Sequence, residues 1–148
     1  MLHMEFVLAI AEDRVPSTKE PDPYMHIFLD AGNVLAFFEL PTRPEMGRDP
    51  NTPEWVQHIA FKVKDRETLL AYKEHLEANG VQVLGVTDHG AFHSIYFFDP
   101  NGHRLELACP DPDEAGMLRR MDEVKWKMLE DWSATKRAPH HADLLHRR

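Results

Sequence analysis

The chain has 148 residues, enough for one domain of ordinary size, and 43% of them are hydrophobic, which excludes a disordered chain. The 25 acidic residues outnumber the 17 basic ones, and the net charge of −8 argues against nucleic acid as a partner. No apolar run approaches the roughly 20 residues of a membrane span, and the N-terminus lacks the features of a signal peptide, so we expect no membrane partner. The single cysteine, Cys109, excludes an intrachain disulfide and predicts a cytoplasmic protein.

The N-terminal part predicts three strands. Residues 3–11 form one apolar run, and residues 24–41 form two further runs on either side of the turn-forming stretch Asp30-Ala31-Gly32-Asn33. We assign residues 1–41 to a first, partial module. A proline-rich segment, residues 42–54, then predicts a connector.

Residues 55–65 alternate between polar and apolar side chains, which predicts a strand with His58 on the face opposite Ile59 and Phe61. A helix follows, with Asp65 as its cap and Gly80 at its end.

Residues 81–87 predict the next strand, and residues 93–108 predict a hairpin around the turn Asp99-Pro100-Asn101-Gly102. Near the end of this hairpin Glu106 lies on a strand that is otherwise largely apolar. The alternation leaves two interpretations open, a carboxylate that faces water and a functional carboxylate.

The C-terminal region, residues 110–148, differs in composition from the rest of the chain. Residues 113–132 predict an amphipathic helix with a stripe of methionines, which favours a packing face over a cofactor site. That face covers either the chain's own sheet or a partner subunit.

A weak internal repeat links the two parts of the chain. Each last strand carries a glutamate followed by leucine, Glu39 in "VLAFFELP" and Glu106 in "HRLELACP". The repeat suggests two copies of one unit with equivalent carboxylates.

The motifs "QHIAFKV", "ANGV" and "SIYFFDPNGHRLEL" resemble the vicinal oxygen chelate superfamily, which includes glyoxalase I, extradiol dioxygenases and the fosfomycin and bleomycin resistance proteins. The resemblance covers residues 3–108. It implies an α+β fold of paired βαβββ modules, the second over residues 55–109. It also implies that His58 and Glu106 bind a divalent metal, Fe(II), Mn(II), Ni(II) or Zn(II), and that Tyr96 lines the pocket. If no metal is bound, we expect the nitrogen and oxygen of this pair about 5 Å apart.

The chain departs from the resemblance at the first module, because it starts at what corresponds to the second strand. The missing strand normally supplies a metal ligand. Three explanations remain open: the chain is part of a longer protein, a second subunit completes the site, or the metal chemistry has been lost.

The reaction stays open between two enzyme classes and a binding protein. A glyoxalase I-like lyase or isomerase would recruit Glu39 as a further ligand. An extradiol dioxygenase would use a histidine near Tyr96, and His89 and His93 favour this reading because they can transfer a proton to or from a catechol oxygen. A resistance-type protein would bind a small molecule without turnover. We also expect a homodimer, because an open sheet edge and the methionine-rich helix both favour association.

Overall fold

The structure is a computed structural model that describes residues 3–30, 32, 34–44, 47 and 49–137. The chain divides into two compact units between Asp49 and Pro50, within the predicted connector.

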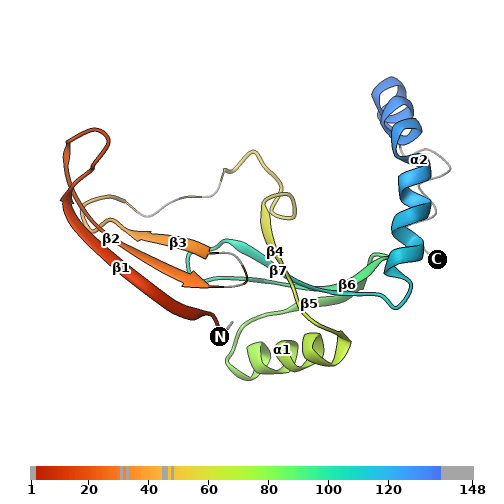
Figure 1. The fold of residues 1–148 in the computed structure, drawn as a ribbon, viewed down its shortest axis with the longest axis horizontal. Coiled ribbons are helices and arrows are strands. Elements are labelled where there is room, and N and C mark those ends of the chain that lie inside the picture. The colour runs from red at the N-terminus through yellow and green to blue at the C-terminus, as the bar shows by residue number, and fades with distance from the viewer. Residues whose placement is uncertain (1–2, 31, 33, 45–46, 48, 138–148) are drawn as a thin grey trace. The chain divides into compact units, whose positions relative to one another are not determined.

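The first unit contains one antiparallel sheet of three strands (Figure 1). Its strands are β1 (Glu5–Arg14), β2 (Pro21–Asp30) and β3 (Val34–Glu39), in the order β1-β2-β3. The turn before β3 contains Gly32 at a φ of +87°, and its N–H donates to Asp30 Oδ1 at 2.7 Å. The predicted strand and hairpin are therefore confirmed.

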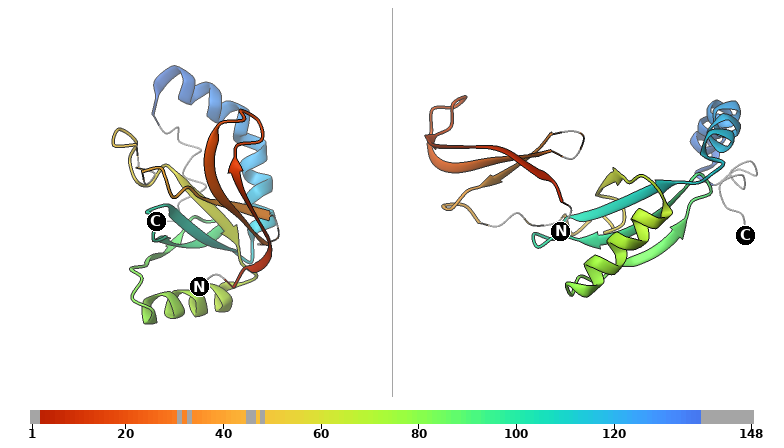
Figure 2. Two further views of the ribbon diagram at one scale, coloured as in Figure 1. Left: turned by 90° about the vertical axis from the view of Figure 1, so that its left-hand side faces the viewer. Right: turned by 60° about the horizontal axis from the view of Figure 1, so that its bottom comes forward.

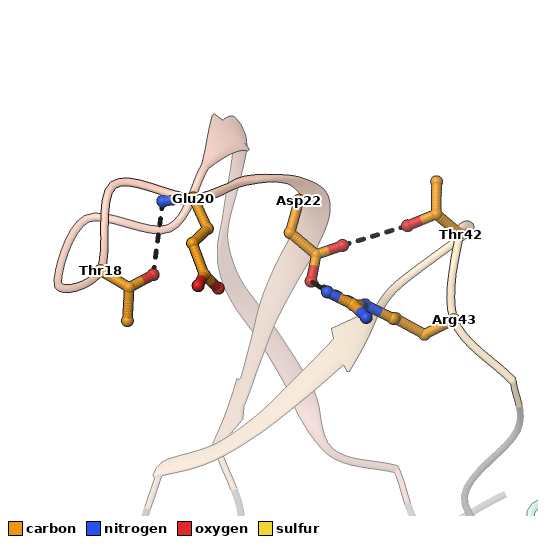
Figure 3. A network of polar contacts seen from close by, with 5 residues as sticks. All are labelled: Thr18, Glu20, Asp22, Thr42 and Arg43. Carbon is orange, nitrogen blue, oxygen red and sulfur yellow. Dashed lines mark hydrogen bonds and ion pairs between the residues drawn. The ribbon is translucent and has the colours of Figure 1, made fainter.

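A buried carboxylate fastens the segment after β3 to the start of β2 (Figure 3). Asp22 is 8% exposed and accepts hydrogen bonds from Thr42 Oγ1 at 3.0 Å and Arg43 Nε at 2.9 Å. The hydrogen bond from Arg43 holds the pKa of the Asp22 carboxyl below its usual value. These two hydrogen bonds hold the residues that follow β3 against the start of β2.

The second unit has the order strand, helix, strand, strand, strand. Its elements are β4 (His58–Lys62), α1 (Arg66–Ala78), β5 (Leu84–Asp88), β6 (Phe92–Phe98) and β7 (Arg104–Pro110). The sheet has the order β4-β7-β6-β5, in which β4 runs parallel to β7 and the other neighbours are antiparallel. This is the βαβββ module predicted for the second part of the chain, and the three strands of the first unit match the last three strands of such a module.

Helix α1 covers one face of this sheet (Figure 2, right). Its N-cap is Asp65, as predicted, with the carboxylate accepting from the Thr68 backbone N–H at 2.9 Å. The core lies between the helix and the sheet, and includes Leu69, Leu76, Ile95, Phe97, Leu107 and Cys109. Because side chains alternate along a strand, the neighbours of these core residues on β6 and β7 point to the other face.

Helix α2 (Glu114–Thr135) follows β7, close to the predicted range of residues 113–132. Only Gly116 and Met117 of this helix are buried. No helix in the described part of the chain is long and apolar enough to cross a membrane.

Candidate functional site

The two side chains that the motifs single out meet on the face of the second sheet opposite α1. His58 begins β4, and Glu106 lies in the middle of the adjacent strand β7. His58 Nε2 lies 2.9 Å from Glu106 Oε2. The distance is shorter than the 5 Å that we expected, because the two groups contact each other directly. The Glu106 side chain is 5% exposed, so the interpretation that it faces water is wrong.

Ser94 holds the second oxygen of the Glu106 carboxylate. Its hydroxyl donates to Glu106 Oε1 at 2.5 Å, and the residue is completely buried on β6. The carboxylate thus has one oxygen on Ser94 and the other facing His58. A buried carboxylate is costly unless it is hydrogen-bonded, and this arrangement satisfies both oxygens while fixing their orientation.

Tyr96 lies beside this pair, opposite Glu106 in the β6–β7 register. Its hydroxyl lies 2.8 Å from His89 Nε2, and the His58 ring meets the Tyr96 ring edge-on with centroids 6.1 Å apart. Burial, and next the charge of Glu106, raise the pKa of the Tyr96 phenol. The phenol therefore keeps its proton at neutral pH.

The two histidines proposed as proton carriers lie in different places. His89 contacts Tyr96 and stacks on Phe92 with ring centroids 4.9 Å apart. His93 precedes Ser94 on β6 and so points to the opposite face, where its ring nitrogens lie 3.9 Å from Asp88 and 4.0 Å from Asp111. The structure brings His89 to the site and does not bring His93 there.

Arg104 is a site residue that the sequence analysis did not identify. It lies on the same strand face as Glu106, and its guanidinium carbon lies 4.2 Å from the centroid of the Tyr96 ring. Ser94 was also missed. The hairpin register pairs Tyr96 with Glu106, so Ser94 and Arg104, each two residues from a member of that pair, lie on the same sheet face. This shared face is the signal that marks them.

Glu39, the third proposed metal ligand, ends β3 in the first unit. There it lines an open cavity of about 480 Å³ together with Glu12, Asp13 and Tyr24. Its role as a ligand stays a prediction.

The His58–Glu106 pair fits two adjacent positions around one metal ion. Ligand atoms that are each about 2.1 Å from a metal and at right angles to each other lie about 3 Å apart, close to the 2.9 Å of this pair. The hydrogen bond from Ser94 is the kind of support that metal-binding carboxylates receive. Within the described ranges, no group of three or more histidine, cysteine, aspartate and glutamate side chains converges as a complete metal site.

A match to a known protein family covers most of this fold. Residues 7–107 match the sequence model of the Glyoxalase/Bleomycin resistance protein/Dioxygenase superfamily. The chain belongs to this superfamily. The match spans both sheets, which agrees with the resemblance seen in the sequence motifs and with the α+β fold of βαβββ modules.

Curated relatives in the superfamily include two proteins of Bacillus subtilis. The putative ring-cleaving dioxygenase MhqA is 28% identical over 81 residues, which cover 55% of this chain and 26% of that protein. The putative ring-cleaving dioxygenase MhqO is 31% identical over 83 residues, which cover 56% of this chain and 25% of that protein. The matched region thus spans about a quarter of the length of these relatives.

A solved structure of the superfamily shares the fold. The fosfomycin resistance protein FosX of Listeria monocytogenes is 23% identical, with a TM-score of 0.50, and the match covers 76% of this chain and 79% of that protein. At this identity the likeness concerns the fold alone.

Proposed function

We propose that His58 and Glu106 are two ligands of a divalent metal ion, and that the site acts on a small substrate with two neighbouring oxygens by dioxygenase-like ring cleavage. The observation that carries the proposal is the contact between His58 and a buried Glu106 whose other oxygen is held by Ser94. A metal bound there would act as a Lewis acid on the two substrate oxygens.

The remaining residues of the site supply proton transfer. The Tyr96 phenol keeps its proton and can donate a hydrogen bond to a substrate oxygen. When His89 Nε2 carries no proton, the phenol can instead give its own proton to Nε2 as it accepts the proton that leaves the substrate, which provides a route to an imidazole. The names of the two Bacillus subtilis relatives favour ring cleavage over other reactions of the superfamily.

The second candidate is a glyoxalase I-like lyase or isomerase, which the repeat of Glu39 and Glu106 favours. In that case the Glu39 carboxylate completes the metal site. The change Glu39→Gln should then abolish metal binding, whereas a dioxygenase-like site should keep its metal.

Metal analysis of the purified protein, followed by oxygen uptake with catechol after loading with Fe(II), tests the proposal. We expect one metal ion per chain and catechol-dependent oxygen uptake in the wild type. His58→Ala and Glu106→Gln should each lower metal affinity at least tenfold, because each removes a ligand. A wild-type protein that binds no divalent metal would contradict the proposal.

Glu74→Gln is the matched control for Glu106→Gln, since Glu74 is exposed on α1 and the substitution removes the same charge. It should leave both metal binding and oxygen uptake unchanged. Metal and catechol binding without oxygen uptake would exclude ring cleavage and leave the glyoxalase I-like enzyme and the third class, a binding protein that performs no chemistry.

A further inference from the structure

An open cavity of about 330 Å³ adjoins the candidate metal pair in the second unit. It shares His58 with that pair, and its lining is Val56, Gln57, His58, Ile59, His103 and Arg104. A substrate group bound in this cavity would therefore lie next to an atom bound at His58.

The lining of this cavity has an unusual charge for this chain. The chain carries 25 acidic residues against 17 basic ones, yet the cavity contains one arginine, two histidines and no carboxylate. The guanidinium of Arg104 forms no ion pair within the described part of the chain. A positive charge with no carboxylate partner favours an anion from outside the chain.

A cation–π contact with Tyr96 helps to hold the guanidinium of Arg104 at this place. Arg104 lies on the Tyr96 ring at 4.2 Å, and Tyr96 is itself fixed by its contact with His89. A guanidinium that a ring holds in place loses less side-chain entropy when it binds a planar oxyanion.

We propose that this cavity binds a carboxylate of the substrate, with Arg104 as the residue that recognises it and His103 as a second donor. The substrate class is thus a small aromatic acid that carries two neighbouring oxygens for the metal and a carboxylate for Arg104. This inference rests on the proposed function for the metal side of the substrate, whereas the carboxylate side stands on Arg104 and the cavity.

Three probes separate the two parts of the proposal, each titrated calorimetrically against the full chain loaded with Zn(II), which prevents turnover. Catechol has the two oxygens only, benzoate has the carboxylate only, and 3,4-dihydroxybenzoate has both. We expect the dihydroxybenzoate to bind about tenfold or more tightly than catechol, because a hydrogen bond to a charged group contributes at least that factor. Arg104→Gln should remove this advantage, and it should weaken the binding of benzoate and of dihydroxybenzoate severalfold more than that of catechol.

Two further variants complete the test. Arg119→Gln removes the same charge from an exposed position on α2 and should change none of the three affinities. Arg104→Lys keeps the charge without the planar fork, so it should weaken benzoate binding severalfold, and it decides the matter if Arg104→Gln does not fold.

The outcomes distinguish the two proposals. Benzoate binding that is unchanged in both Arg104 variants, or equal losses for catechol and dihydroxybenzoate in Arg104→Gln, would overturn the carboxylate site. Catechol binding that depends on neither metal nor His58, with benzoate binding still dependent on Arg104, would overturn the proposed function and leave the carboxylate site standing.

Discussion

Burial of Glu106 is the decisive feature at the scale of single residues. A carboxylate that is 5% exposed in the side chain requires compensation, which Ser94 supplies at one oxygen and His58 at the other. The His58 side chain remains 31% exposed. In this pair the carboxylate is therefore buried and fixed, whereas the imidazole is accessible. This asymmetry suits a ligand set in which the carboxylate stays in place and the imidazole faces the incoming ligand.

Ser94→Ala should weaken metal binding roughly tenfold, because loss of a hydrogen bond to a ligating carboxylate typically costs 10–100-fold in affinity. Titration with Zn(II) in competition with a chelator measures the affinity directly, without any need for activity. Ser94→Thr keeps the hydroxyl and should recover most of the affinity. Ser133→Ala, at an exposed position on α2, is the control. Equal affinity in the wild type and Ser94→Ala would show that the serine only fills space.

The sequence was sufficient to single out His58 and Glu106, which the structure brings together, but not the residues around them. His58 and Glu106 could be identified because their strands and their motif were recognisable. Ser94 and Arg104 were missed because a serine or an arginine on a strand is usually a solvated residue. Here each of them contacts a site residue on the neighbouring strand, and that contact follows only from the pairing of β6 with β7.

At the scale of elements, turn and capping residues predicted the helix and the hairpin that they form locally. The Asp99–Gly102 turn and the Asp65 cap produce β6, β7 and α1 close to the expected ranges. The start of β5 was less accurate, at Leu84 instead of residue 81. The parallel pairing of β4 with β7 has no local signal, because 41 residues lie between Lys62 and Arg104, and the sequence did not predict it.

Asp65→Ala should lower the melting temperature by a few degrees, because it removes the acceptor for the first turn of α1. The Thr68 backbone N–H holds the pKa of Asp65 below its usual value, so the cap stabilises the fold above the unfolded pKa of about 4. That contribution is lost as the pH falls through the lower pKa of the folded state. The difference in melting temperature between wild type and variant should therefore shrink below about pH 4.

Asp65→Asn separates the charge from the hydrogen bond. The amide oxygen can still cap the helix, so this variant should retain most of the stability at neutral pH. It should also show less change than the wild type when the pH is lowered. A melting temperature of Asp65→Ala equal to that of the wild type at pH 7 would contradict the capping role.

At the scale of the whole molecule, the second unit contains a βαβββ module with its own core, and the first contributes a three-stranded sheet of the same type. Superfamily membership could be predicted because the motif of the second module survives in full. The role of Glu39 as a metal ligand stays a prediction, because Glu39 lies in the first unit and its candidacy rests on the repeat alone.

Helix α2 leads to a prediction about association, which remains our proposal. Leu118, Trp126, Leu129 and Trp132 are each between 49% and 70% exposed. Exposed apolar side chains that gather on one element often mark an interface, and a helix of 22 residues is long enough to pack against a second copy of itself. We therefore expect a homodimer formed through α2.

Light scattering at micromolar concentration should give twice the 17.2 kDa mass of one chain. The double change Leu129→Ser and Trp132→Ser should shift the mass towards that of the single chain, because it removes two of the four exposed apolar side chains without touching the buried Met117. Leu70→Ser is the matched control, since Leu70 is 44% exposed on α1, and it should leave the dimer intact. A folded wild-type protein with the mass of one chain would exclude the dimer, and a dimer that persists in the double variant would place the interface away from α2.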